Sequence, residues 1–180
     1  MMTQGFLSFA LAAVFLLSLF SSAVLLQKGR PDYSYERFRA FELQEIAVKR
    51  AFYAAVSEAA REALSSSSQE GAGAYFAVRA SAHLRAIDFS RKLSSQGYDA
   101  AFWCGGATPE ARRQASLSMQ RQKRAVAPEG TLPLGACAGA IDADLLERKL
   151  HFSGLGFSIY SDGLGIGRAA GFPSGFEADF

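Results

Sequence analysis

The first 26 residues constrain this chain more than any other feature. Residues 6–26 read FLSFALAAVFLLSLFSSAVLL, and the first charged side chain in the whole sequence is Lys28. As a helix with a rise of about 1.5 Å per residue, this segment is about 31 Å long, which matches a bilayer core of about 30 Å. We therefore expect residues 1–5 to form a short polar N-terminus and residues 6–26 to be a transmembrane helix or a signal segment.

The fate of this segment has more than one interpretation. The small residues of Ser21-Ser22-Ala23 are of the kind that signal peptidase accepts, and about 15 apolar residues precede them. However, Met1–Gly5 contains no Lys or Arg, and the apolar stretch continues to Leu26. These features favour a retained single-pass anchor in the cell membrane over a cleaved secretory peptide. A buried helix of a soluble protein is the remaining alternative, but such a helix rarely runs this long without a charge.

Two features disagree about the side of the membrane on which the remainder lies. Lys28, Arg30, Arg37 and Arg39 follow the apolar segment, and the positive-inside rule would place them in the cytoplasm. Cys104 and Cys137 indicate the opposite side, because an even pair of cysteines in an exported chain most often forms a disulfide. Two small buried apolar side chains are the alternative for the cysteines. We expect the Cys104–Cys137 disulfide and an extracytoplasmic domain.

Residues 33–180 are expected to form one α+β domain after a juxtamembrane break at residues 27–32, where Gly29 and Pro31 interrupt a helix. A long amphipathic helix is predicted over Tyr33–Leu64. Glu45 and Lys49 interrupt its apolar side and stand at the spacing of an i,i+4 ion pair. The residues of the apolar side are Tyr35, Phe38, Phe41, Val48, Phe52, Val56, Ala59 and Ala63.

Further helices are predicted over Ala72–Leu93 and from Thr108-Pro109-Glu110 to about Arg124, where a capping hydroxyl, a proline and an acid mark a helix start. A short helix is expected over Leu145–Leu150, with Asp142 or Asp144 as its cap. The helix over Ala72–Leu93 has two apolar stripes, so we expect it to be central and packed on both sides. The stripes hold Phe76, Ala80, Leu84 and Ile87, and Tyr75, Val78, Ala82, Phe89 and Leu93.

Strand signals are confined to the second half of the chain. Tyr98–Cys104 has the aromatic content of a strand. Apolar residues alternate at Phe157 and Ile159 and again at Leu164 and Ile166, on either side of the turn dipeptide Asp162-Gly163. Residues Phe176–Phe180 could add one more strand. The expected fold is therefore a transmembrane helix, a long amphipathic helix, further helices and a small C-terminal antiparallel β-sheet.

This layout resembles that of type IV pilin-like proteins, including the archaeal ones with class III signal segments. The junction Gly5-Phe6 stands where the prepilin peptidase of that family cuts, after a glycine and before the apolar stretch. The resemblance implies cleavage of the leader between Gly5 and Phe6. It also implies an apolar helix that forms the core of a filament or stays in the membrane.

The most basic stretch of the chain is Thr108–Arg124, which carries Arg112, Arg113, Arg121, Lys123 and Arg124. The interpretations are a solvated helix face or a contact face for anionic lipid headgroups, nucleic acid or the acidic C-terminal quarter. Residues 1–124 hold 16 Lys and Arg against 10 Asp and Glu, whereas residues 125–180 hold 3 against 7. Because the stretch has no stacking aromatic side chains, no nucleic acid is expected as a partner.

Catalytic and cofactor motifs are each explained better in another way. His83 and His151 are too far in sequence from each other and from the cysteines for the usual zinc spacing, and His83 is expected to be a satisfied core histidine. A cysteine nucleophile would need the sulfur that the disulfide uses. Gly163–Gly167 lacks the helix that a dinucleotide fingerprint requires, so tight hairpin packing explains its glycines better. We expect no catalytic, cofactor or metal residues and no small-molecule substrate.

The sequence thus predicts a non-enzymatic, membrane-anchored structural or assembly protein of the cell surface, pilin-like in plan. Its expected partners are the lipid bilayer and copies of itself or other pilin-like subunits. The alternatives are a single-pass protein whose domain binds a protein partner, and a secreted domain with a cleaved signal peptide.

Overall fold

The computed structural model describes residues 33–68, 71–95, 99–137, 139–172 and 177–180. The predicted transmembrane segment 6–26, the Gly5–Phe6 junction and the break at 27–32 lie outside these residues. Within the described part of the chain, no helix has both the length and the apolar character needed to cross a membrane.

The described residues form helices and two antiparallel sheets, which confirms the predicted α+β class. The helices are α2 (Tyr33–Ser66), α3 (Ala72–Ser95) and α4 (Pro109–Gln122), with the short 3-10 helix η1 at Leu134–Ala136. The first sheet has the order β2-β1-β5-β6 and the second the order β3-β4-β7, so two small sheets replace the single one expected. The strands are β1 (Asp99–Cys104), β2 (Leu132–Pro133), β3 (Ile141–Asp144), β4 (Lys149–Phe152), β5 (Leu155–Ser161), β6 (Ile166–Gly171) and β7 (Glu177–Asp179).

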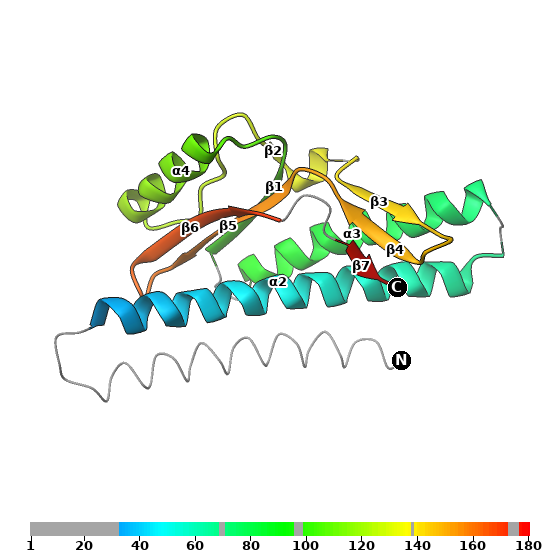
Figure 1. The fold of residues 1–180 in the computed structure, drawn as a ribbon, viewed down its shortest axis with the longest axis horizontal. Helices are drawn as coiled ribbons and strands as arrows, with labels where there is room; N and C mark the ends of the chain where they lie inside the picture. Colours follow the sequence, from blue (N-terminus) through cyan, green and yellow to red (C-terminus); the bar gives the residue numbers. More distant parts are fainter. Residues whose placement is uncertain (1–32, 69–70, 96–98, 138, 173–176) are drawn as a thin grey trace.

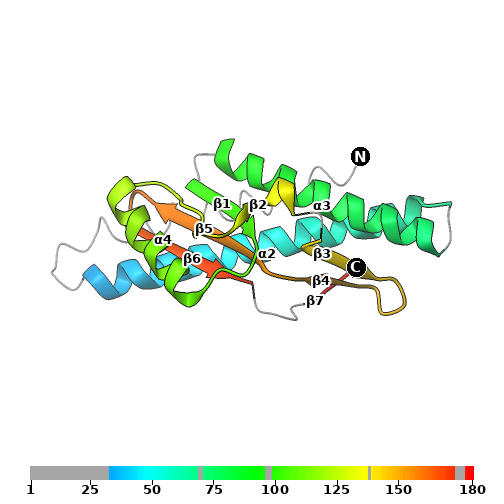
Figure 2. The ribbon, with the colours of Figure 1, turned by 90° about the horizontal axis from the view of Figure 1, so that it is seen from above.

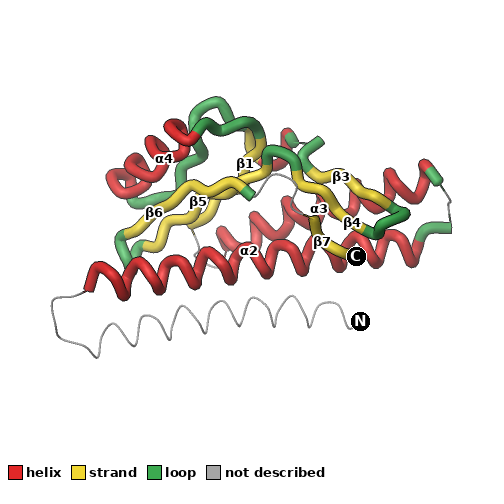
Figure 3. The backbone as a smooth tube through the Cα atoms, viewed as in Figure 1, coloured by secondary structure: helices red, strands yellow, loops and turns green. Residues whose placement is uncertain are grey.

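The elements are arranged in layers (Figure 1). Helices α2 and α3 lie side by side along one face of the molecule, and both sheets lie over them, as the view from above also shows (Figure 2). Helix α4 covers the other side of the first sheet, over β5 and β6 (Figure 3). The first sheet is therefore enclosed between two layers of helix, and α2 extends beneath both sheets.

The core lies between the helix pair and the sheets and is rich in phenylalanine. Phe52 of α2 is fully buried at its centre. Its ring stacks on Phe102 of β1 with a centroid distance of 5.1 Å and lies 5.7 Å from Phe89 of α3 and 5.2 Å from Phe172. The Phe52 ring of α2 therefore contacts α3, strand β1 of the first sheet and the chain that follows β6.

Most of the predicted apolar side of α2 is confirmed, since Phe41, Val48 and Val56 are buried together with Phe52. Phe38 is instead 46% exposed and Tyr35 70% exposed. The start of α2 lies at the end of the β5–β6 hairpin (Figure 1), and Phe38 borders an open hollow there rather than the closed core.

Helix α3 is covered on one side, so the prediction of a central helix is wrong. Val78, Phe89 and Leu93 are buried against α2 and the sheets. Phe76 and Leu84 of the other stripe are 62% and 66% exposed, because both sheets lie on the same side of the helix pair.

The predicted helix over Leu145–Leu150 is also wrong. Lys149–Phe152 is strand β4, which pairs with β3 on one side and with β7 on the other. The carboxylate of Asp144 accepts hydrogen bonds from the backbone N–H groups of Leu146 and Glu147, so it closes a tight turn rather than capping a helix. Pairing with two neighbouring strands outweighs the weak local helix preference of this short segment.

The predicted hairpin is confirmed as β5–β6. Ser161 pairs with Ile166, so four residues rather than two connect the strands. Gly165 in this connection has a φ of 66°, a conformation that glycine adopts without steric cost.

Gly156 provides a test of the sheet packing. It lies directly opposite Trp103 on the neighbouring strand, and a Cβ atom at Gly156 would stand 2.2 Å from the Trp103 ring. The ring is 2% exposed and is held by its indole N–H, which donates to the buried hydroxyl of Ser158 at 3.1 Å. The Gly156→Ala change should therefore overpack the sheet and lower the free energy of unfolding by about 1–3 kcal/mol, or more if the ring cannot move.

Chemical denaturation of the full chain in a neutral detergent measures this effect. Gly163→Ala is the matched control, because a Cβ at Gly163 meets no atom within 4 Å. It should change the stability by less than about 0.5 kcal/mol. Equal effects of the two changes would show that Trp103 does not pack on Gly156.

Candidate functional site

Helix α4 is placed on β6 by contacts that its own sequence supplies. The hydroxyl of Thr108 caps the helix by accepting from the N–H of Ala111 at 3.1 Å, as predicted, and Lys123 ends the helix in a left-handed conformation. The hydroxyl of Ser116 accepts from the N–H of Ala169 at 3.1 Å and donates to the carbonyl of Arg112 at 2.9 Å. Ser116 thus joins α4 to the edge of the first sheet.

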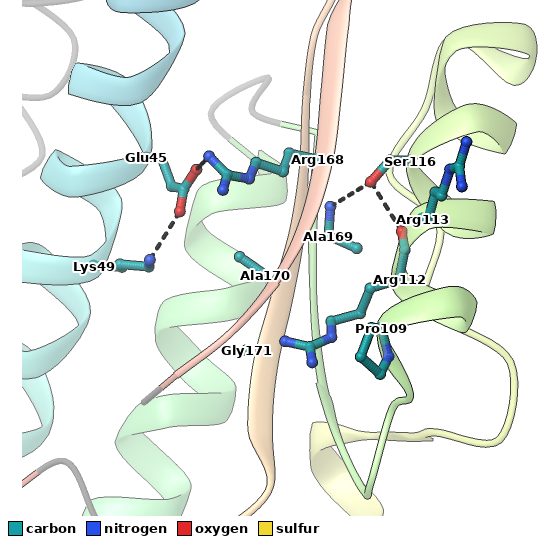
Figure 4. A pocket seen from close by; sticks show the side chains of 10 residues that line it. All are labelled: Glu45, Lys49, Pro109, Arg112, Arg113, Ser116, Arg168, Ala169, Ala170 and Gly171. Atoms are coloured by element: carbon teal, nitrogen blue, oxygen red, sulfur yellow. Dashed lines mark hydrogen bonds and ion pairs between the residues drawn. The ribbon is translucent and has the colours of Figure 1, made fainter. Parts of the chain in front are cut away.

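The seam between α4, β6 and α2 contains a hollow of about 420 Å³, which we call the basic groove (Figure 4). This volume is within the usual range for small-ligand sites. Its lining holds four cationic side chains and one carboxylate. The lining residues are Glu45, Lys49, Pro109, Arg112, Arg113, Ser116, Arg168, Ala169, Ala170 and Gly171.

The carboxylate of Glu45 is shared by two cations. Its side chain is only 8% exposed, and Lys49 lies 2.8 Å from one oxygen while Arg168 lies 3.4 Å from the other. The pair between Glu45 and Lys49 confirms the i,i+4 prediction. Lys49 also lies 5.2 Å from the centroid of the Phe157 ring. One negative charge therefore balances only one of the two positive charges beside it.

Arg112 brings a further positive charge from the α4 side. In Figure 4 the guanidinium of Arg112 extends towards Gly171, whereas the guanidinium of Arg113 points away from the hollow. Its Nη1 atom would lie 3.3 Å from a Cβ at Gly171. Its Nε atom is buried and has no hydrogen-bond partner among the described residues. A buried donor without an acceptor is costly, and no described residue supplies a counter-charge to this guanidinium.

The structure separates the residues of the predicted basic face. Arg112 and Arg113 line the basic groove, whereas Arg121, Lys123 and Arg124 are exposed outside it. None of the ion pairs between described residues joins these five side chains to the acidic C-terminal quarter. Helix α4 does pack on the C-terminal quarter, through β6, but this contact contains no ion pair between the described residues.

Two cations of the groove were not predicted as contact residues. Lys49 carried a signal in the sequence, since a charged pair on the apolar side of α2 indicates a polar opening in the core. Arg168 carried none, because its position follows from the pairing of β6 with β5, which places Arg168 opposite Ile159 and beside α2.

A second hollow of about 470 Å³ adjoins the basic groove, and we call it the apolar groove. Ser116 and Arg168 line both hollows. The apolar groove lies between the start of α2 and the β5–β6 connection, and its apolar lining consists of Phe38, Phe41, Leu164 and Ile166. Its rim also carries the polar side chains of Ser34, Arg37, Ser116, Gln120 and Arg168. Charged and apolar linings thus lie next to each other along one seam.

The cysteines and histidines do not form a metal or nucleophile site. Cys104 at the end of β1 and Cys137 after η1 are joined by a disulfide, with Cα atoms 5.9 Å apart. The Nε2 atom of His83 lies 3.1 Å from the carbonyl of Leu134, and Nδ1 of His151 lies 3.6 Å from Glu177. No three His, Cys, Asp or Glu side chains gather as a metal site in the described ranges.

Another polar cluster joins α3 to the second sheet. The hydroxyl of Tyr75 donates to Asp142 of β3 at 2.5 Å, and the Nε atom of Arg79 donates to the carbonyl of Ile141 at 3.2 Å. The hydrogen bond from Tyr75 holds the pKa of Asp142 below its usual value, and the backbone N–H of Ala143 acts in the same direction. These groups satisfy one another, so the cluster fastens β3 to α3 and the basic groove is the better candidate site.

Comparison with known proteins identifies no relative: no protein-family model, no curated protein and no solved structure matches this chain. The class of the protein is therefore defined by its own architecture, an α+β domain in which two helices support two antiparallel sheets.

Proposed function

We propose that the protein is a non-enzymatic, membrane-anchored structural or assembly protein of the cell surface, pilin-like in plan. The observation that carries this proposal is the position of α2. It is the first described helix after the uncharged segment 6–26, and it is 34 residues long, or about 51 Å. It extends beneath both sheets and supplies the centre of the core. An anchor that precedes such a helix would hold the whole domain.

The disulfide supports an extracytoplasmic location. Structural disulfides persist in oxidising compartments and are rare in the cytosol. The bond closes a loop over a sequence separation of 33 residues, in a domain whose core is modest. In this proposal the bond outweighs the positive charges at Lys28 and Arg30, which favour the opposite orientation.

The exposed stripe of α3 supports an assembly role. Phe76, Ala80 and Leu84 stand at i, i+4 and i+8 on one line of the helix surface, and all three are exposed. Apolar side chains aligned in this way on an outer face are typical of surfaces that a further subunit covers. A partner of a different sequence would use the same stripe, so the single-pass partner-binding protein is the second candidate.

Membrane retention is expected to survive alkaline carbonate washing, with the full chain recovered in the membrane pellet. The Leu16→Arg change should cost about 2.5–3.5 kcal/mol of insertion free energy and move much of the protein to the soluble fraction. Leu146→Arg is the matched control, because Leu146 is 97% exposed on the domain. Release of the unchanged protein into the soluble fraction would contradict an anchor.

The mass of the purified protein's N-terminus separates the candidate forms. A chain that begins at Phe6 supports the pilin-like plan with leader cleavage, and a chain that begins at Met1 supports an uncleaved anchor. A chain that begins at Val24 would contradict the proposal in favour of a secreted domain. Chemical crosslinking of intact membranes then distinguishes self-assembly, which gives multiples of one mass, from a complex with a different protein.

A further inference from the structure

We propose that the basic groove binds the phosphate of an anionic phospholipid headgroup, with the apolar groove beside it receiving the lipid's apolar part. This inference deepens the proposed function and rests on it, because it presumes that the domain stands at a membrane surface.

The first argument is the charge of the basic groove. Three cationic side chains, Lys49, Arg112 and Arg168, face the hollow against the single negative charge of Glu45, whereas the guanidinium of Arg113 extends away from it. Because Glu45 is shared between Lys49 and Arg168, none of its charge remains for Arg112. Such an excess of like charge in a hollow attracts an anion, and a guanidinium is the donor best matched to phosphate oxygens.

The second argument is the fixed position of the donors. The Nε atom of Arg112 is buried, which restricts the positions that its guanidinium can take. The N–H of Ala169 already bonds to Ser116 on the α4 side of β6. Gly171, two residues on, presents its N–H to the same side, because alternate residues of an antiparallel strand face the same way. A phosphate would therefore find a guanidinium and a backbone N–H held by the fold.

The third argument distinguishes a lipid from a free anion. The apolar groove shares Ser116 and Arg168 with the basic groove and opens beside the half-exposed ring of Phe38. A free phosphate makes no favourable contact with an apolar surface, whereas a phospholipid has both a phosphate and an apolar chain. Tyr35, which is 70% exposed one turn before Phe38, is of the residue type enriched at membrane–water interfaces.

The fourth argument is reach. The six residues 27–32 separate the apolar segment from α2 and can span at most about 20 Å. In an anchored chain the start of α2, and with it the apolar groove, must therefore lie close to the headgroups. Glu45, which lines the basic groove, is twelve residues further along α2, so this groove lies about 18 Å along the helix from its start.

The test uses the full chain in a neutral maltoside detergent, titrated with dioctanoyl phosphatidylglycerol and followed by native mass spectrometry. We expect one tightly bound lipid per chain, and weaker binding of dioctanoyl phosphatidylcholine, whose positive choline is repelled. Arg112→Gln should lower the affinity about tenfold, the effect of losing one charge-assisted hydrogen bond. Arg121→Gln, which removes the same charge from the exposed end of α4, should lower it less than about twofold.

Arg168→Gln is a second variant, because Glu45 keeps Lys49 as its partner when Arg168 is removed. It should also weaken binding, and thermal melting checks that both variants remain folded. Equal losses for Arg112→Gln and Arg121→Gln would show diffuse attraction and overturn the groove. Displacement of the lipid by an equal concentration of inorganic phosphate would show a free-phosphate site and overturn the lipid. The absence of any bound lipid would overturn the proposal directly.

Failure here and failure of the proposed function can be told apart. Carbonate washing and the N-terminal mass do not depend on Arg112, and lipid binding in detergent does not depend on anchoring. A retained chain that binds no phosphatidylglycerol would contradict the lipid site alone.

Discussion

Phe52→Ala is expected to lower the free energy of unfolding by about 3–5 kcal/mol, the largest effect of any single substitution proposed for this chain. The side chain of Phe52 is fully buried and contacts the rings of Phe89, Phe102 and Phe172. Truncation removes its buried area and leaves a cavity between α2, α3, β1 and the chain that follows β6. Because these rings belong to different elements, no single movement can fill the space.

Chemical denaturation of the full chain in neutral detergent measures this loss, and Phe76→Ala is the matched control. Phe76 undergoes the same chemical change at a position that is 62% exposed, so its truncation should cost less than about 0.5 kcal/mol. If Phe52→Ala proved as mild as Phe76→Ala, the assignment of α2 as the centre of the core would be wrong.

Replacement of both cysteines by alanine is expected to lower the free energy of unfolding by about 3–4 kcal/mol. The disulfide between Cys104 and Cys137 spans 33 residues, and the unfolded chain gains the freedom of that loop when the bond is absent. The loop contains α4 and its contacts with β6, so the basic groove should be less rigid in the variant. This second effect follows from the fold and not from the loop length.

Denaturation of the unchanged protein with and without reductant checks the value, and the double variant should not respond to reductant. Alkylation of the native protein provides an independent measurement. Two freely modified thiols in the native protein would contradict the bond and move the domain towards the cytoplasmic orientation that Lys28 and Arg30 favour. A loss below about 1 kcal/mol would show that packing of α4 already restricts the loop.

The sequence indicated some of the residues of the basic groove but not their arrangement. Arg112 and Arg113 were recognisable as part of a basic helix, and the spacing of Glu45 and Lys49 predicted their ion pair. Nothing near Arg168 in the chain indicated that it would approach Glu45, which lies 123 residues earlier. The site could not be assembled in advance because its walls come from three elements that meet only in the folded state.

The errors in the helix predictions have the same origin. Phe76 and Leu84 stand on one apolar stripe of α3 and Val78 and Ala82 on the other, yet only the latter pair is buried, because the sheets lie on one side of α3. Lys149 and Leu150 form β4 because β3 and β7 flank them, although their local preference is equally compatible with a helix.

The sequence by itself determined the features that depend on a few consecutive residues or on composition. The cap at Thr108, the pair between Glu45 and Lys49, the long helix α2 and the hairpin around Asp162 all rest on interactions over one to three turns or on one strand connection. The disulfide was predicted from the number and context of the cysteines. Only the tertiary structure decided which apolar stripes are covered, how the strands divide into two sheets and that Arg168 joins Arg112 in one groove. Those outcomes depend on contacts between distant segments, whose free energies are summed over the whole fold and leave no local pattern in the chain.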